Sequence, residues 1–450
     1  MGFPFRNIRL TAALVSAVLF GNAVLHADPV LLPNPFNLLN QAPLFGDCFG
    51  CRPEKQKCGV DLTAQSVNDV LGNATGGAST GTTCSGLLNL ALAADLKQLV
   101  GWEGASFKNT WIWLYGRDLS GQVVGNALTV SGVAGVPAFR CYELWFQQNF
   151  FTDVVSLRAG MLGLDTEFMT TDAGTLFLNT TFGMASLLTL DFPNAGPTYP
   201  AGTPGLRLAL QPVSWLTFRS AFAQANPFAQ SSSAHGFDWN FGPDGGLLSL
   251  NEAAATWNKE ADSKRLGGTA KAGFWIQNGA SAAPSPGYAF ASSSLPGYLS
   301  GFYGSLEQQL YNVRENLSSP GKNPKQAVAG GVATKGIAGF TRVGFSPQLG
   351  TSCSLYADAG LVYTGLLPTR DQDKLGVAFA YAQVGSGLVD QATAQGLPGA
   401  GFESVAELTY SIRLAPAITL QPDLQYVLHP GGTQRYGNAL VMGVRAVVNF

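Results

Sequence analysis

The sequence predicts an all-β fold: a transmembrane antiparallel β-barrel of about sixteen strands, with a short N-terminal loop and helix region. Near the end of the chain, apolar side chains recur at every second position, as in a strand with one apolar face. Charged residues make up 12% of the composition, about half of the usual ~25%. The chain also begins with an export signal and ends on an aromatic residue, Phe450. A soluble sheet alternates too, so these last features favour a barrel in the outer membrane.

The first 27 residues have the pattern of a secretory signal peptide. Arg6 and Arg9 precede an apolar run from residue 10 to residue 20, and the chain then reaches a plausible cleavage site after Ala27, with Ala23 as a second candidate. The apolar run is shorter than the roughly 20 residues that a spanning helix needs. No later stretch is long and apolar enough either, and only a closed barrel then satisfies every backbone group in lipid.

Residues 28–104 do not alternate, and we expect them to form a Cys-containing loop and helix region before a barrel at 105–450. The segment GNATGGASTGTT is rich in Gly, Ser and Thr and is expected to be a loop. Residues 85–100 have helical spacing, with Leu88, Leu92 and Leu96 on one face. Such a helix either closes one side of the barrel or, more simply, packs on its first strands.

Six cysteines remain after export, and four of them come before residue 85: Cys48, Cys51, Cys58, Cys84, Cys141 and Cys353. In an oxidising compartment the expected state is disulfide pairing, and four cysteines leave three connectivities open. The alternative is a metal site, because C-x2-C is ligand-like spacing. No second such pair and no nearby histidine completes it, so disulfides are the preferred interpretation.

The strand pattern is clear from residue 105 onward. One example is a predicted hairpin in which Tyr142 and Leu144 face outward and Glu143 and Trp145 face inward. Long Gly/Pro/Ser stretches at 226–246, 278–299 and 385–401 are candidate external loops, one of which is expected to fold inward. Charges recur on the less apolar strand face: Arg158, Arg207, Arg219, Arg342, Arg413 and Arg445, with Glu143, Glu307, Asp358, Glu407 and Asp423.

These charges are expected to point into the lumen, because a cation on the lipid face costs about 2–4 kcal/mol near the membrane midplane. Two interpretations are open for each of them. An ion-pair ladder would rigidify the wall, and this is the better interpretation for most individual residues. A pore constriction would use guanidinium and carboxylate groups to hydrogen-bond sugar hydroxyls, with an aromatic such as Trp145 as a stacking face.

Other classes of function lack support in the residues. After the signal only two histidines remain, His235 and His429, and no G-x-S-x-G, H-E-x-x-H or P-loop pattern is present. An enzyme is therefore disfavoured, and no catalytic residue, cofactor or metal site is expected. The net charge of −2 gives no electrostatic basis for binding nucleic acid.

The segment RCYELWFQQNFFTDVVSLRAGMLGLDTEF resembles the signature of the carbohydrate-selective porins of the OprB family. LFLNTTFG, the segment at 199–208, LYADAGLVYTGLLPTRDQDKLGVAFAYAQVG and AITLQPDLQYVLHPGGTQRYGNALVMGVR extend the resemblance over most of residues 85–450. It implies a sixteen-stranded outer-membrane barrel that passes glucose and other sugars by facilitated diffusion. By matching positions, the resemblance implies these eyelet residues: Arg140, Glu143, Trp145, Arg158, Asp165 and Glu167.

Arg207 and Arg219 join these candidates through their inward strand parity. The chain departs from the family pattern in its cysteine cluster and in Gln147 and Gln148, where an acidic residue is common. Arg140 also has the outward parity of Tyr142, which requires a position beyond the membrane band or a bulge.

The predicted function is passive diffusion of sugars, monosaccharides or small oligosaccharides, through a charged, aromatic-lined eyelet in an outer-membrane porin. A general or other-solute porin on the same barrel is the first alternative, and a structural envelope barrel with a plugged lumen is the second. The expected surroundings are outer-membrane lipid, and a homotrimer is compatible with this class of protein.

Overall fold

The computed structural model describes residues 44, 58–192, 196–227, 235–237, 239, 245–259, 265–279, 297–312, 335–394, 396, 399 and 401–450. The predicted signal peptide at 1–27, Cys48 and Cys51 lie outside these residues. All elements below belong to the part of the chain from residue 39 onward, which forms one compact unit.

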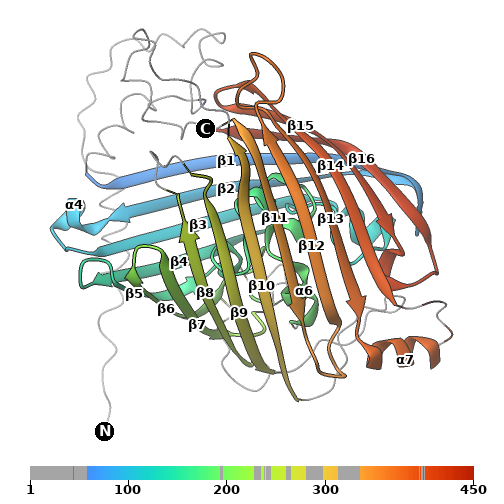
Figure 1. The fold of residues 1–450 in the computed structure, drawn as a ribbon, viewed down its shortest axis with the longest axis horizontal. Helices are drawn as coiled ribbons and strands as arrows, with labels where there is room; N and C mark the ends of the chain where they lie inside the picture. The colour runs from blue at the N-terminus through green and yellow to red at the C-terminus, as the bar shows by residue number, and fades with distance from the viewer. Residues whose placement is uncertain are drawn as a thin grey trace, which may run out of the picture. The chain divides into compact units, whose positions relative to one another are not determined.

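Sixteen antiparallel strands form one closed barrel in which each strand pairs with its neighbours in sequence and β1 closes on β16 (Figure 1). This confirms the predicted fold class and strand number. The strands are β1 Val60–Gly77, β2 Gly81–Asp95, β3 Ala105–Gly116, β4 Ala138–Phe150, β5 Val155–Leu162, β6 Thr203–Val213, β7 Leu216–Gln224, β8 Leu247–Trp257, β9 Gly268–Gly279, β10 Gly297–Asn312, β11 Gly336–Phe345, β12 Cys353–Thr364, β13 Lys374–Val384, β14 Phe402–Ala415, β15 Ile418–Leu428 and β16 Gly437–Asn449.

The last strand closes the barrel with the facing that its alternation predicts. Gln65 of β1 stands opposite Asn449 of β16, and the backbone N–H of Phe450 donates to Ala64 O at 2.9 Å. Met442 is 45% exposed on the outer surface, while Ala439 and Val441 are fully buried toward the lumen. We call the rim where β1 begins and β16 ends the terminal rim, and the other end the opposite rim.

The barrel begins earlier than the sequence indicated. Residues 60–77 and 81–95 are its first two strands, so the expected loop and the expected helix at 85–100 are wrong; only α4, Leu96–Val100, is helical. The reason is geometric: a spacing of four residues puts Leu88 and Leu92 on one face of a helix, but also on one face of a strand. Residues 81–95 form a strand because their backbone hydrogen-bonds to β1 on one side and to β3 on the other.

A β-bulge corrects the predicted facing of the first hairpin. Thr110 of β3 stands opposite Glu143 of β4, whereas Trp111 stands opposite Cys141, so β4 carries one extra residue between them. The bulge lets Tyr142 and Glu143 both lie inside, buried at 6% and 3% exposure. The outward facing predicted for Tyr142 is therefore wrong.

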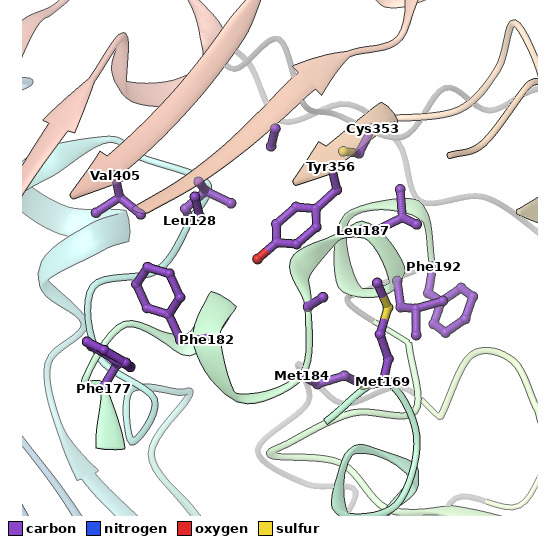
Figure 2. Packing of buried hydrophobic residues seen from close by; sticks show 14 of the residues in the cluster. Leu128, Met169, Phe177, Phe182, Met184, Leu187, Phe192, Cys353, Tyr356 and Val405 are labelled. Atoms are coloured by element: carbon purple, nitrogen blue, oxygen red, sulfur yellow. The ribbon is translucent and has the colours of Figure 1, made fainter. Parts of the chain in front are cut away.

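The β5–β6 connection folds into the barrel and fills a large part of it. Its residues 163–192, here called the inserted segment, contain η2 Leu164–Thr166, η3 Ala173–Leu176, α5 Thr180–Gly183 and α6 Ser186–Asp191. Their apolar side chains form a core with lumen-facing strand residues and with the β3–β4 connection, which carries the π-helical turn η1 Ser120–Val124. Figure 2 shows Tyr356 reaching from β12 toward this core, with Phe182 and Leu187 on either side in this view.

The sequence did not single out the inserted segment as the one that folds inward. Of the three stretches expected to be loops, 226–246 and 278–299 lie partly outside the described residues, and 385–401 contains a helix, α7 Ser386–Ala394. A short 3₁₀ turn, η6 Pro430–Gly432, joins β15 to β16. Among the described residues, no helix has the length and apolar character to cross a membrane.

Replacing Gly160 with alanine is expected to destabilise the barrel by about 1–3 kcal/mol, the usual range for a residue held in strained backbone geometry. Gly160 lies opposite Trp145 with φ at +133°, and a Cβ there would stand 2.2 Å from Leu144 O. Urea unfolding of the folded protein measures the change. Gly183→Ala is the control, because a Cβ at Gly183 meets nothing within 4 Å; an equal effect of both changes would contradict the prediction.

Candidate functional site: a charged constriction in the lumen

Charged and amide side chains from neighbouring strands line one side of the lumen. Strand alternation turns side chains of β3 to β9 inward, and the inserted segment brings Glu167 against this wall. The residues that meet there are Lys108, Glu143, Trp145, Gln147, Arg158, Glu167, Arg207, Arg219, Glu252 and Lys271. We call this set the charged wall.

The centre of the charged wall is a pair of arginines bridged by one carboxylate. Arg158 of β5 and Arg207 of β6 stand opposite each other in register. A carboxylate oxygen of Glu167 lies 2.5 Å from Arg158 Nη1, and the other lies 2.9 Å from Arg207 Nε. Both arginines also donate to a single atom, Gln147 Oε1, at 2.9–3.0 Å. Two guanidinium groups are thus held side by side by one carboxylate and one neutral amide.

An aromatic ring and a second acid adjoin this pair. The guanidinium carbon of Arg158 lies 3.9 Å above the centre of the Trp145 ring, a cation–π contact. The indole N–H of Trp145 donates to Glu143 at 3.1 Å, and Glu143 forms an ion pair with Lys108 at 2.6 Å. Trp145 is therefore fixed in orientation by both of its neighbours.

A second cationic pair follows on β7 and β9. Arg219 and Lys271 both face Glu252, at 3.3 and 3.6 Å. The Glu252 side chain is fully buried, whereas that of Arg219 is 28% exposed. Glu252 also accepts hydrogen bonds from the Tyr303 hydroxyl and the Met169 N–H. The carboxylate is thus enclosed while the cations face the open side.

A cavity of about 450 Å³ lies between the charged wall and the inserted segment. Its lining is mostly polar, and we call it the vestibule; the residues that matter below are Asp153, Glu167, Asp172, Arg207, Arg219 and Lys271. The strand ends that line it are those of the terminal rim. Monosaccharides bring many hydroxyl groups, and donors and acceptors in fixed positions around such a space can hydrogen-bond them.

Comparison with known proteins decides what this barrel is. The family of carbohydrate-selective porins, OprB family, matches residues 79–450. The chain belongs to this family. It is 24% identical to porin B of Pseudomonas aeruginosa, over 91% of this chain and 92% of that protein. It is 22% identical to the putative porin QuiX of Acinetobacter baylyi, over 97% and 98%.

Solved structures agree with this porin fold. The high-pH structure of Pseudomonas putida OprB has a TM-score of 0.76 at 21% identity, covering 91% of this chain and 99% of that one. The low-pH structure has a TM-score of 0.56 at 18% identity, with the same coverage. Family and fold are those of channels rather than enzymes, and they place this porin in the outer membrane.

Six of the eight candidate residues come together in this porin, and two lie apart. Glu143, Trp145, Arg158, Glu167, Arg207 and Arg219 all belong to the charged wall. Arg140 is buried at 2% exposure, and Asp165 accepts a hydrogen bond from the Tyr142 hydroxyl. Of the eight candidates, Glu167, Arg207 and Arg219 line the vestibule.

Sequence reasoning missed Lys108, Gln147, Lys271 and Glu252. The signal for Lys271 was present, because Phe274 and Ile276 are exposed on the outer face, and parity then turns Lys271 inward. Gln147 was noted only as a departure from the family pattern, since nothing in a sequence shows two arginines from other strands converging on one amide.

Other inward-facing charges of the barrel, outside the charged wall, hold the inserted segment in this porin. Arg342 pairs with Asp358 at 2.5 Å, and Glu407 accepts hydrogen bonds from the N–H groups of Leu178 and Asn179 at 2.6 and 3.0 Å. Asp191 at the end of α6 accepts from Cys353 N at 2.8 Å. Burial raises the pKa of the Asp191 carboxyl group to about 6. For these residues the ion-pair and anchoring interpretation holds.

The cysteines do not form the expected disulfides in the described part of the chain. Cys58, Cys84, Cys141 and Cys353 are free thiols. Cys141 and Cys353 are buried in strands, where each thiol lies close to a backbone carbonyl two residues on. Within the described ranges, no cluster of three or more His, Cys, Asp or Glu side chains could hold a metal ion.

Proposed function

We propose that the protein carries monosaccharides or small oligosaccharides across the outer membrane by facilitated diffusion, and that the charged wall is its sugar-binding constriction. One observation carries this proposal: Glu167 clamps Arg158 and Arg207, Arg158 stacks on Trp145, and Glu167 and Arg207 line the polar vestibule. Guanidinium and carboxylate groups form hydrogen bonds with sugar hydroxyls. The apolar ring of Trp145 can pack against a pyranose. Weak binding of this kind lets solute enter and leave again.

Each proposed residue has a role that follows from its contacts. Arg158 and Arg207 donate hydrogen bonds to the sugar, Glu167 keeps them parallel, and Trp145 supplies the flat apolar face. Glu143 orients Trp145 through its indole N–H. Arg219 extends the donor row along the vestibule. Arg140 is buried, and Asp165 accepts a hydrogen bond from the Tyr142 hydroxyl, so neither is given a role in contacting the sugar. Residues 1–27 act as the signal peptide that directs export.

Proteoliposome swelling with uncharged sugars of graded size tests the proposal. We expect glucose to enter faster than disaccharides and larger sugars, because the vestibule of about 450 Å³ admits a monosaccharide more readily than a larger sugar. Amino acids of similar mass serve as the comparison solutes. Equal rates for sugars and amino acids would indicate a general porin. No permeation of any sugar would indicate a barrel plugged by the inserted segment, and would contradict the proposal.

A further inference from the structure

Gln147 lies between Arg158 and Arg207, where a negatively charged side chain would neutralise part of their positive charge. Its Oε1 atom accepts hydrogen bonds from Arg158 Nε at 3.0 Å, from Arg158 Nη2 at 2.9 Å and from Arg207 Nη2 at 2.9 Å. Three N–H groups of two cations thus converge on one uncharged oxygen. Guanidinium groups pair most strongly with carboxylates, since these match the planar fork and carry the opposite charge.

The amide leaves the arginine pair with one positive charge in excess. Glu167 is the carboxylate within ion-pair distance of both arginines. Arg207 Nη1 donates to the Ser156 hydroxyl at 2.8 Å, and this acceptor is also neutral. A glutamate at 147 would bring the group to two cations and two anions, whereas glutamine keeps it at two and one.

The same excess is repeated one step along the wall. Arg219 and Lys271 share Glu252, whose oxygens also take hydrogen bonds from Met169 and Tyr303. Its charge is therefore spread over four donors, and its side chain is fully buried. At this second pair the carboxylate is covered, and Arg219 is the most exposed of the three charges.

The other acidic residues of the vestibule already have partners and are not paired with the two arginines. Asp172 pairs with Lys259 at 3.1 Å, and Glu307 accepts from two backbone N–H groups of the inserted segment at 2.8 and 2.9 Å. Asp153 accepts from the Asn149 side chain in the turn at the terminal rim. The vestibule as a whole is close to charge balance, so the positive excess is local to the constriction.

We propose that this constriction selects for anionic carbohydrates, sugars that carry a carboxylate or a phosphate, and that Gln147 is the residue that sets this preference. The inference rests on the proposed function, because it names the substrate class of the same site. The anionic group would lie against the accessible part of these guanidinium groups, whose side chains are 16% exposed in Arg158 and 7% in Arg207, and would supply the second negative charge that Gln147 does not provide. The sugar hydroxyls would then follow along Arg219 and Lys271.

The test compares fluxes of glucose, gluconate and glucose 6-phosphate into proteoliposomes for the wild type and for Gln147→Glu. In the wild type we expect gluconate to enter faster than glucose. In Gln147→Glu the ratio of gluconate to glucose flux should fall on the order of tenfold, the effect of one added charge at close range in a partly screened site. Glucose 6-phosphate distinguishes a carboxylate preference from a general preference for anions.

Gln211→Glu is the matched control. Gln211 lines the same vestibule, but its side chain donates to Ser214 O at 3.2 Å, and among the described residues no hydrogen bond joins it to a guanidinium group. This variant adds the same charge without compensating the arginine pair, so its effect should stay within about threefold, as expected for a screened charge. An equal change in both variants would overturn the role of Gln147.

The outcome separates this inference from the proposed function. If the protein passes glucose but shows no preference for gluconate, the proposed function is supported and the inference about anionic sugars is contradicted. If the wild type passes no glucose, both are contradicted. Anion over cation permeability in a KCl gradient gives an independent readout, and it should fall in Gln147→Glu even where the flux of neutral sugar is retained. An unchanged ion preference would contradict the inference.

Discussion

Replacing Arg342 with alanine is expected to lower the free energy of unfolding by about 3–5 kcal/mol, the usual cost of breaking a buried ion pair, and to release the inserted segment from the wall. Arg342 and Asp358 are fully buried. The guanidinium donates to Asp358 and to the carbonyl oxygens of Met169, Thr181 and Gly183 at 2.6–2.9 Å.

All five N–H donors of Arg342 therefore have an acceptor, and three of these acceptors are backbone atoms of the inserted segment. Alanine leaves three carbonyl groups and one carboxylate buried without that partner, which costs free energy at each of them. Urea unfolding measures the stability, and single-channel recording measures the pore, whose conductance should rise and become unsteady.

Arg445→Ala is the control for this prediction. Arg445 forms a comparable ion pair with Asp69 at 2.8 Å, and in the described part of the chain the hydrogen bonds of its guanidinium go to Asp69 of β1 and not to the inserted segment. We expect Arg445→Ala to lower stability but to leave conductance steady. Equal channel behaviour in the two variants would show that Arg342 contributes stability alone and does not position the segment.

Arg158→Ala is expected to weaken the block of single-channel current by glucose about tenfold, which corresponds to the loss of one charge-assisted hydrogen bond of roughly 1.5 kcal/mol. The substitution removes donors from the constriction and uncovers the Trp145 ring, against which Arg158 lies at 3.9 Å. It also leaves Glu167 paired with Arg207 alone. The concentration of glucose that halves the current measures the effect.

Arg413→Ala is the matched control for the constriction. Arg413 lies exposed near the terminal rim on β14, away from the charged wall, where it donates to Gln372 and to Pro416 O. The glucose concentration for half-block should stay as in the wild type. A tenfold change in this variant, or none in Arg158→Ala, would place the sugar site elsewhere in the lumen.

The structure shows where sequence patterns fail in this barrel. The strand at 81–95 was mistaken for a helix because Leu88 and Leu92 satisfy both periods. The facing of Tyr142 was wrong because one extra residue in β4 shifts the parity, and a bulge leaves no trace in an alternating pattern. The ion pairs could be anticipated as inward charges, but not their partners, since Arg342 and Asp358 are paired by register and Glu167 arrives from a folded connection.

The sequence by itself determined the barrel, its strand number and, outside the bulge in β4, which residues face outward and which face inward. These follow from a period of two and from the cost of placing a charge in lipid, and both are local properties of the chain. Only the tertiary structure decided which inward residues meet. Residues 163–192 fold back into the lumen, cover Arg342 and Glu407, and leave Arg158, Arg207 and Gln147 beside the vestibule. That choice depends on packing between segments far apart in the chain, which no local pattern encodes.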